Sequence, residues 1–203
     1  MSIRMIRLVA IQFVLCASLS VASWSTLAAS LSLDACIDCH GVDGMGKSDP
    51  TYPVIAGMPI GHIEEAIFAY IDGARRCVWE PRMCEVVASL SEKQVTVAAK
   101  YFSNQVRGPT NEEFDADLAA KGETLHERHC ASCHVPPHDE NAAHAIGIPL
   151  NGQRADYIRF AIIAYLRGDR EALLETMAHE LSLIEPGDLE ALINYYSSYR
   201  SAE

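Results

Sequence analysis

Apolar residues recur along this chain at the spacing of an α-helix, and no stretch shows the alternation typical of a half-buried strand. The last of these stretches begins after Pro186-Gly187-Asp188, and its apolar stripe consists of Leu189, Leu192, Ile193 and Tyr196. Another extends from about residue 155 to 167 and stops at Gly168, a residue typical of helix ends. The second half of the chain is therefore predicted to be helical.

Three more helices follow from the same pattern. One is capped by Asp115 or Asp117 and extends toward Cys130, with Gly122 placed to let it cross the last helix closely. Equivalent helices in the first half are expected near 62–71 and 92–104. We therefore expect an all-α fold.

The two halves of the chain repeat each other. The stretch 66–75 aligns with 161–170, with Ala, Ala, Tyr, Gly and Arg recurring in register. Tyr101-Phe102-Ser103 likewise matches Tyr195-Tyr196-Ser197. Such internal similarity indicates a tandem duplication. The expected division is a signal peptide at 1–22, a first domain at 23–104, a linker at 105–113 and a second domain at 114–203.

Each half contains one copy of the pattern Cys-x-x-Cys-His. The first copy is Cys36-Ile37-Asp38-Cys39-His40, and the second is Cys130-Ala131-Ser132-Cys133-His134. This spacing is the attachment signature of a c-type haem, in which both thiols bind the porphyrin and the adjacent imidazole binds the iron. A four-cysteine zinc site is the alternative that two Cys-x-x-Cys pairs allow. The sequence predicts two covalently bound haem c groups, with His40 and His134 as iron ligands.

A methionine follows each pentapeptide at the same distance. Met83 lies 43 residues after His40, and Met177 lies 43 residues after His134. A thioether on the other face of the iron completes six-coordination and raises the reduction potential, which suits electron transfer. The alternatives are a methionine that only fills the core, a Cys84 thiolate as ligand, and His144 or His179 in place of Met177.

The N-terminal residues predict export. Arg4 and Arg7 precede a short apolar run and small residues, the pattern of a signal peptide cleaved after Ala22 or Ala29. No other segment is apolar enough to span a membrane, so we expect a periplasmic protein. The net charge of −11 argues against nucleic acid as a partner, because nucleic acid is itself negatively charged.

The cysteine count has a consequence for the first half. Seven cysteines occur, of which Cys16 lies in the predicted leader and four belong to the haem motifs. The two that remain are Cys77, six residues before Met83, and Cys84, the residue directly after it. In an oxidising compartment we expect them to form a disulfide that braces the segment carrying Met83.

The order of Cys-x-x-Cys-His, central helix, distal Met and terminal aromatic helix resembles class I cytochromes c. Two such units in tandem resemble the cytochrome c4 group of dihaem proteins. The segments 53–57 and 149–153 are similar to that group's proline-containing loop, whose carbonyl accepts the proton of the proximal His Nδ1; either Ile148 or Pro149 could supply it in the second half. The segments 114–135 and 177–181 look particularly like the dihaem subunit of flavocytochrome c sulfide dehydrogenase.

This resemblance implies a function. The chain would accept electrons from an FAD-containing flavoprotein subunit that oxidises sulfide, and would pass them to a soluble electron-carrier protein. By itself it would be no enzyme. The alternative within the same family is a free cytochrome c4-type carrier serving a terminal oxidase or reductase. A dihaem peroxidase or a thiosulfate-oxidising enzyme would instead need an open or unusual axial position, whereas each half here has its own Met.

Overall fold

The computed structural model describes residues 33–47, 49, 51–78, 81–137, 139–141 and 145–200. The predicted signal peptide lies outside these residues. Residues 33–40 are helical, and the labelled helices of the first half are α2 (Ile60–Ile71), α3 (Pro81–Val87) and α4 (Glu92–Ser103). Those of the second half are α5 (Ala116–His129), α6 (Ala155–Arg167), α7 (Glu175–Ser182) and α8 (Pro186–Ser197). Among the described residues, no helix is long and apolar enough to cross a bilayer.

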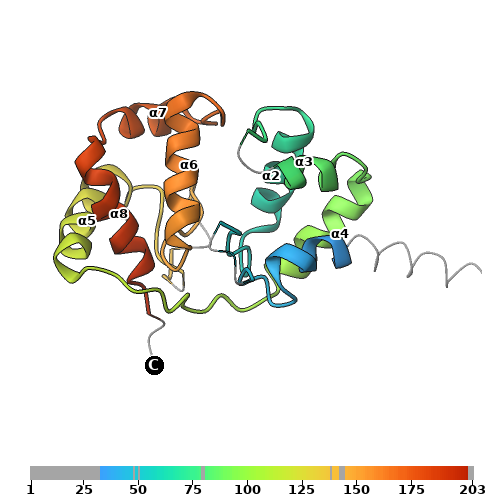
Figure 1. Cartoon of the computed structure of the whole chain (residues 1–203), viewed down its shortest axis with the longest axis horizontal. Coiled ribbons are helices and arrows are strands. Elements are labelled where there is room, and N and C mark those ends of the chain that lie inside the picture. Colours follow the sequence, from blue (N-terminus) through green and yellow to red (C-terminus); the bar gives the residue numbers. More distant parts are fainter. Residues whose placement is uncertain are drawn as a thin grey trace, which may run out of the picture.

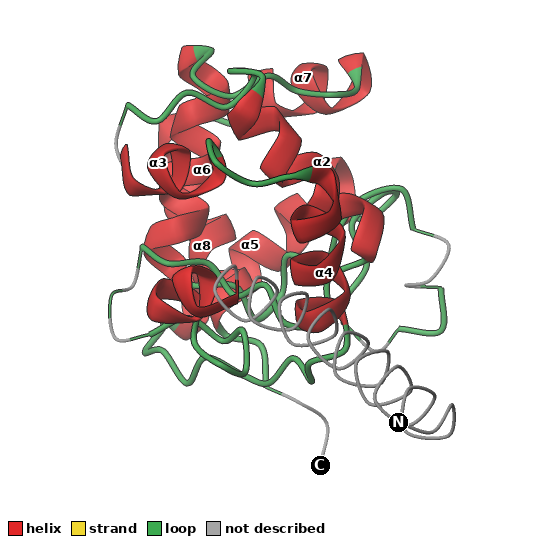
Figure 2. Ribbon diagram, turned by 90° about the vertical axis from the view of Figure 1, so that its right-hand side faces the viewer, coloured by secondary structure: helices red, strands yellow, loops and turns green. Residues whose placement is uncertain are grey.

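The predicted all-α class is confirmed, since the described residues contain helices and a single isolated β-bridge (Figure 2). The bounds of α2, α4 and α6 agree with the expected stretches to within two residues, whereas α8 begins at Pro186, three residues before its expected start. Asp115, rather than Asp117, caps α5: its side chain accepts hydrogen bonds from the backbone N–H groups of Asp117 and Leu118. Gly168 ends α6 with φ 73°, a left-handed conformation that glycine adopts without strain.

Two of the labelled helices were not predicted, and neither was the helical stretch 33–40. Met83 lies on α3 and Met177 lies on α7, and both segments had been interpreted only as stretches that carry a ligand. They have 7 and 8 residues, about two turns each, which is too short for an apolar period to be recognised.

Each half has its own apolar core (Figure 1). The core of the first half joins residues of α2 and α4: Ile63, Ile67, Val95, Ala99 and Phe102, with Met58 and Val87. The core of the second half joins α5, α6 and α8: Leu125, Ile158, Ala191, Leu192, Ile193 and Tyr196. The chain between α4 and α5 runs beneath both halves and connects them. Separate cores agree with a duplicated unit.

Helices α5 and α8 cross closely at Gly122, as the small residue there predicted. A Cβ atom on Gly122 would overlap the backbone of Ala191 and come within 2.7 Å of Tyr195 Cβ. Only a residue without a side chain permits this approach. The crossing fixes the direction of α5, whose last residue precedes Cys130.

Backbone and side-chain contacts join the two halves. Arg75 and Arg170 form the isolated antiparallel bridge, and Arg76 N donates to Asp169 O at 2.8 Å. The Gln153 side chain accepts from Val54 N at 2.7 Å and donates to Val54 O at 2.9 Å. Gln153 is buried, so both of these hydrogen bonds are shielded from water. The segment before α2 therefore meets the segment before α6, and the segment after α2 meets the segment after α6, at the boundary between the halves.

Candidate functional site: two Cys-x-x-Cys-His centres

The first pentapeptide lies at the end of the helix at 33–40. Neither Cys36 nor Cys39 is part of a disulfide, and His40 is only 9% exposed. His40 Nδ1 lies 3.2 Å from Pro53 O and donates to it. Burial lowers the pKa of His40, so the imidazole is neutral. A neutral ring that donates from Nδ1 leaves Nε2 unprotonated and available to a metal.

The second pentapeptide begins at the C-cap of α5. Cys130 and Cys133 are free, and His134 Nδ1 donates to Ile148 O at 2.8 Å. The choice between Ile148 and Pro149 is thus decided for Ile148, which occupies the position of Pro53 in the repeat. Burial lowers the pKa of His134 as well. Gly147 packs on the imidazole, since a Cβ there would lie 2.5 Å from His134 Nδ1.

A mostly apolar cavity in the first half brings the predicted site residues together. Its walls include Cys36, Cys39, His40 and Met83, with apolar side chains of α2, α3 and α4 around them. Two thiols, one imidazole with a free nitrogen and one thioether are the donor set that a c-type haem requires. The residues present therefore fit the group. In the second half the same residue types occur at matching positions, with Met177 half-buried on α7.

The two cysteine pairs stay apart, one in each half. Among the described residues, no group of three or more His, Cys, Asp or Glu side chains is placed to hold a metal ion. The four-cysteine zinc alternative would require all four thiols at one point.

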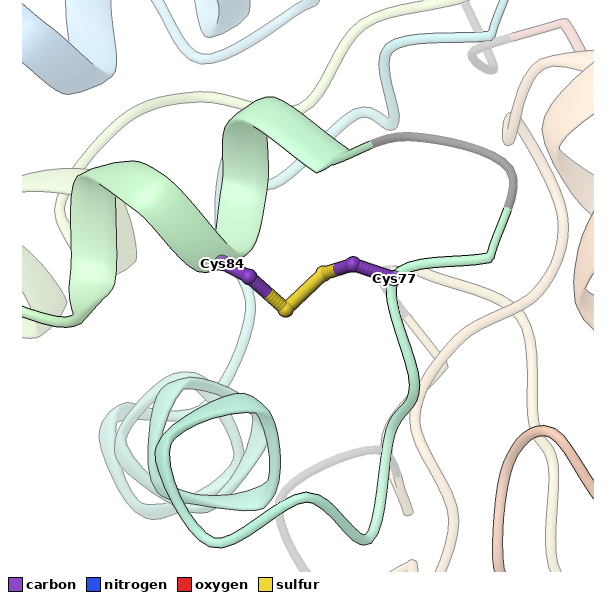
Figure 3. Close-up of a disulfide and its surroundings, with 2 residues drawn as sticks. All are labelled: Cys77 and Cys84. Carbon is purple, nitrogen blue, oxygen red and sulfur yellow. A yellow bond between two sulfur atoms is a disulfide. The ribbon is translucent and has the colours of Figure 1, made fainter.

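Cys77 and Cys84 form a disulfide (Figure 3). Their Cα atoms are 6.1 Å apart, and the bond connects the segment after α2 to the middle of α3. Cys84 is therefore unavailable as a thiolate ligand. Met83, the residue before it, lines the cavity of the first half.

Two of the other histidines of the second half, His126 and His129, have side-chain partners. His126 is buried and its Nδ1 lies 3.1 Å from Tyr196 Oη. His129 Nδ1 donates to Glu180 Oε2 at 2.8 Å. His179 is exposed on α7. His138 and His144 lie outside the described residues.

The repeated Arg and Tyr residues meet where the two halves join. The Arg75 guanidinium carbon lies 5.6 Å from the centroid of the Tyr70 ring, and that of Arg170 lies 4.5 Å from Tyr165. Arg75 and Arg170 both line the cavity of the first half. Arg170 Nε is buried and has no hydrogen-bond partner among the described residues. Both repeated arginines therefore pack on the repeated tyrosine of their own half.

The sequence did not predict that the second half would line the first cavity. Ile148, Tyr157 and Phe160 of the second half line it. His62 of α2, in the first half, also lines this cavity. Burial, with Arg75 and Arg170 nearby, lowers the pKa of His62 to about 4. His62 and Tyr157 occupy the same position in the repeat. This matched position in the repeat is the signal from which His62 and Tyr157 could have been predicted as site residues.

No protein-family model matches the chain. The thiosulfate dehydrogenase electron acceptor of Thiomonas intermedia (strain K12) is 32% identical over 176 residues, covering 80% of this chain and 76% of the relative. The protein of the same name from Stutzerimonas stutzeri (strain A1501) is 27% identical over 184 residues, covering 83% and 81%. Both alignments thus extend over most of each protein.

Three solved structures are similar. Cytochrome c4 of Acidithiobacillus ferrooxidans has a TM-score of 0.69 at 25% identity, covering 82% of this chain and 99% of the other. Cytochrome c4 of Pseudomonas stutzeri has 0.66 at 25% identity, covering 84% and 96%. The thiosulfate dehydrogenase TsdBA of Marichromatium purpuratum has 0.65 at 21% identity, covering 81% of this chain but 36% of the other, and shows a shared fold.

Proposed function

The chain belongs to the family of the thiosulfate dehydrogenase electron acceptors and has the fold of the dihaem c4 cytochromes, and from this premise we propose that it is an exported two-haem relay. Each domain would hold one covalently bound haem c, which supplies a reversible one-electron change at iron. The chain receives single electrons from a dehydrogenase and hands them to a soluble carrier. It needs no catalytic residue of its own.

In the first domain, Cys36 and Cys39 would hold the porphyrin through thioethers, and His40 and Met83 would be the axial ligands. The observation that carries this proposal is that all four side chains line one cavity. The Pro53 carbonyl orients His40 and fixes its tautomer. Because the cavity offers both an imidazole and a thioether, a bound iron would have no position left for substrate, which favours electron transfer over peroxidase chemistry.

In the second domain the corresponding set is Cys130, Cys133, His134 and Met177. Its support is the repeat, which places the same four residue types at equal spacing, and the Ile148 carbonyl that orients His134. We further propose that Arg170 reaches a carboxylate of the first haem, since its buried Nε has no other hydrogen-bond partner among the described residues.

The ligand assignment is tested by replacing each methionine. Met177→Ala should abolish the thioether-to-iron charge-transfer band of one haem and lower that haem's potential, because an axial thioether favours ferrous iron. Met83→Ala should do the same to the other haem. Absorption spectroscopy and potentiometric titration measure both effects. A spectrum unchanged by either substitution would refute that ligand.

The electron donor is proposed from the relatives, which are named as electron acceptors of thiosulfate dehydrogenase. A second candidate donor is an FAD-containing sulfide dehydrogenase subunit, which the likeness of residues 114–135 to a flavocytochrome c subunit favours. Purification from the native host separates the two. Reduction of both haems by thiosulfate through a copurifying, flavin-free protein supports the first donor; copurification with an FAD protein and reduction by sulfide supports the second.

A further inference from the structure

The helices that carry the two methionines are short and pack weakly. Helix α3 buries only Val87, and α7 buries none of its residues. Apolar packing therefore contributes little to holding either helix in place, because the buried area is small. A methionine on such a helix needs another restraint if it is to stay on an iron.

In the first half the restraint is covalent. Cys84 follows Met83 directly, and its disulfide leads to Cys77. The residue before Cys77, Arg76, donates its backbone N–H to Asp169 O at 2.8 Å and forms an ion pair with the Asp169 side chain at 3.1 Å. The disulfide thus connects the Met83 helix to the boundary between the two halves (Figure 3).

The second half has a different restraint. Ala178 occupies the position of Cys84, so no disulfide can form there. Glu180, one turn after Met177, instead accepts a 2.8 Å hydrogen bond from His129, the residue that precedes Cys130. Both side chains are partly buried, with 14% and 32% exposed. This bond connects α7 to α5, and the first half has Ala35 where His129 would be.

We propose that these contacts are separate positioning devices: the Cys77–Cys84 disulfide holds Met83 on the first iron, and the His129–Glu180 hydrogen bond holds Met177 on the second. The proposal rests on the axial ligands assigned above. A covalent link limits how far Met83 can move, whereas a hydrogen bond opens and closes. Met177 is therefore the ligand that dissociates first, and the two haems differ although their ligand sets are the same.

The test follows methionine dissociation in the ferric holoprotein during a guanidinium titration. The charge-transfer band of each haem reports its own methionine, and Met83→Ala and Met177→Ala identify which component belongs to which half. In the unmodified protein the Met177 component should disappear at the lower denaturant concentration. Equal midpoints, or earlier loss of Met83, would overturn the proposal.

Glu180→Ala removes the hydrogen bond of the second half without touching a haem-binding residue. It should raise the dissociated fraction of Met177 about tenfold at fixed denaturant, since one charged hydrogen bond is lost, and leave Met83 unchanged. Glu180→Gln can still accept from His129 and should restore part of the effect. The matched control is His179→Ala, an exposed neighbour on the same helix. Equal effects of Glu180→Ala and His179→Ala would refute the role of Glu180.

The double variant Cys77→Ala, Cys84→Ala removes the disulfide of the first half. It introduces alanine at both positions, as in the second half, where the equivalent residues are Ala172 and Ala178. The double variant should lower the denaturant midpoint for loss of Met83 and leave Met177 as it was. A shift of both haems together would show a general loss of stability and contradict separate devices. If Met177→Ala itself left both bands intact, the ligand assignment would fail, and the positioning proposal would fall with it for that separate reason.

Discussion

At the scale of single residues, the site depends on carbonyl groups that the sequence could place only approximately. Pro53 O and Ile148 O each accept the Nδ1 proton of a proximal histidine. In the second half the sequence left Ile148 and Pro149 as alternatives, because the backbone conformation, and not the residue type, sets where a carbonyl points. Ile148 serves because it stands where the repeat places Pro53.

Arg107 is a residue whose burial no sequence pattern revealed. It is 4% exposed, and burial lowers its pKa to about 10. Its three guanidinium nitrogens have no hydrogen-bond partner among the described residues. Its side chain lies between the turn at Gly57 and the turn at Gly152. A Cβ added to Gly57 would lie 3.5 Å from Arg107 Cβ, and a Cβ added to Gly152 would lie 3.7 Å from Arg107 Nε. An uncompensated buried charge lowers stability.

Arg107→Met should therefore raise the free energy of unfolding by about 1–4 kcal/mol, because a buried charge is replaced by an apolar chain of similar volume. Guanidinium unfolding followed by circular dichroism measures the change. The control, Arg154→Met, should lower stability, since Arg154 donates to Met45 O and Gly46 O at 3.3 Å. If Arg107→Met lowers the free energy of unfolding and Arg107→Lys keeps it at the original value, the charge at position 107 has a stabilising partner and the prediction is wrong.

At the scale of elements, the long helices followed from periodicity and the short ones did not. Helices α2, α4, α6 and α8 have 12 or 13 residues, which is enough for three turns of pattern. Helices α3 and α7 bury one residue or none, so they leave no apolar stripe to recognise. Met83 and Met177 could nevertheless be proposed as ligands, because the evidence for them is spacing between repeats and not the local element.

The crossing of α5 and α8 gives a prediction at this scale. Gly122→Ala should destabilise the protein by about 1–3 kcal/mol, because the new methyl group overlaps Ala191 and forces the helices apart. Gly61→Ala on α2, where no atom lies within 4 Å of the added methyl, should instead stabilise by up to about 1 kcal/mol. Chemical unfolding of both variants measures the contrast, and equal effects would show that the crossing is not tight.

At the scale of the whole molecule, charge governs the encounter with partners. The net charge of −11 should attract a basic electron carrier and repel an acidic one. The bimolecular rate of electron transfer to a basic carrier should therefore fall as ionic strength rises, since salt screens the attraction. Stopped-flow kinetics at several salt concentrations measure this. A rate that stays constant or rises with salt would contradict electrostatic steering.

The sequence alone determined what repeats: the duplication, the helical class, both Cys-x-x-Cys-His motifs and a methionine for each. These are local or periodic features, so spacing along the chain is enough to find them. Only the tertiary structure decided which distant residues meet: Tyr157 and Arg170 of the second half line the cavity of the first, and Glu180 bonds to His129 within the second half. Such contacts join residues 51 or more positions apart, and their partners are chosen by how helices pack, which no short-range pattern records.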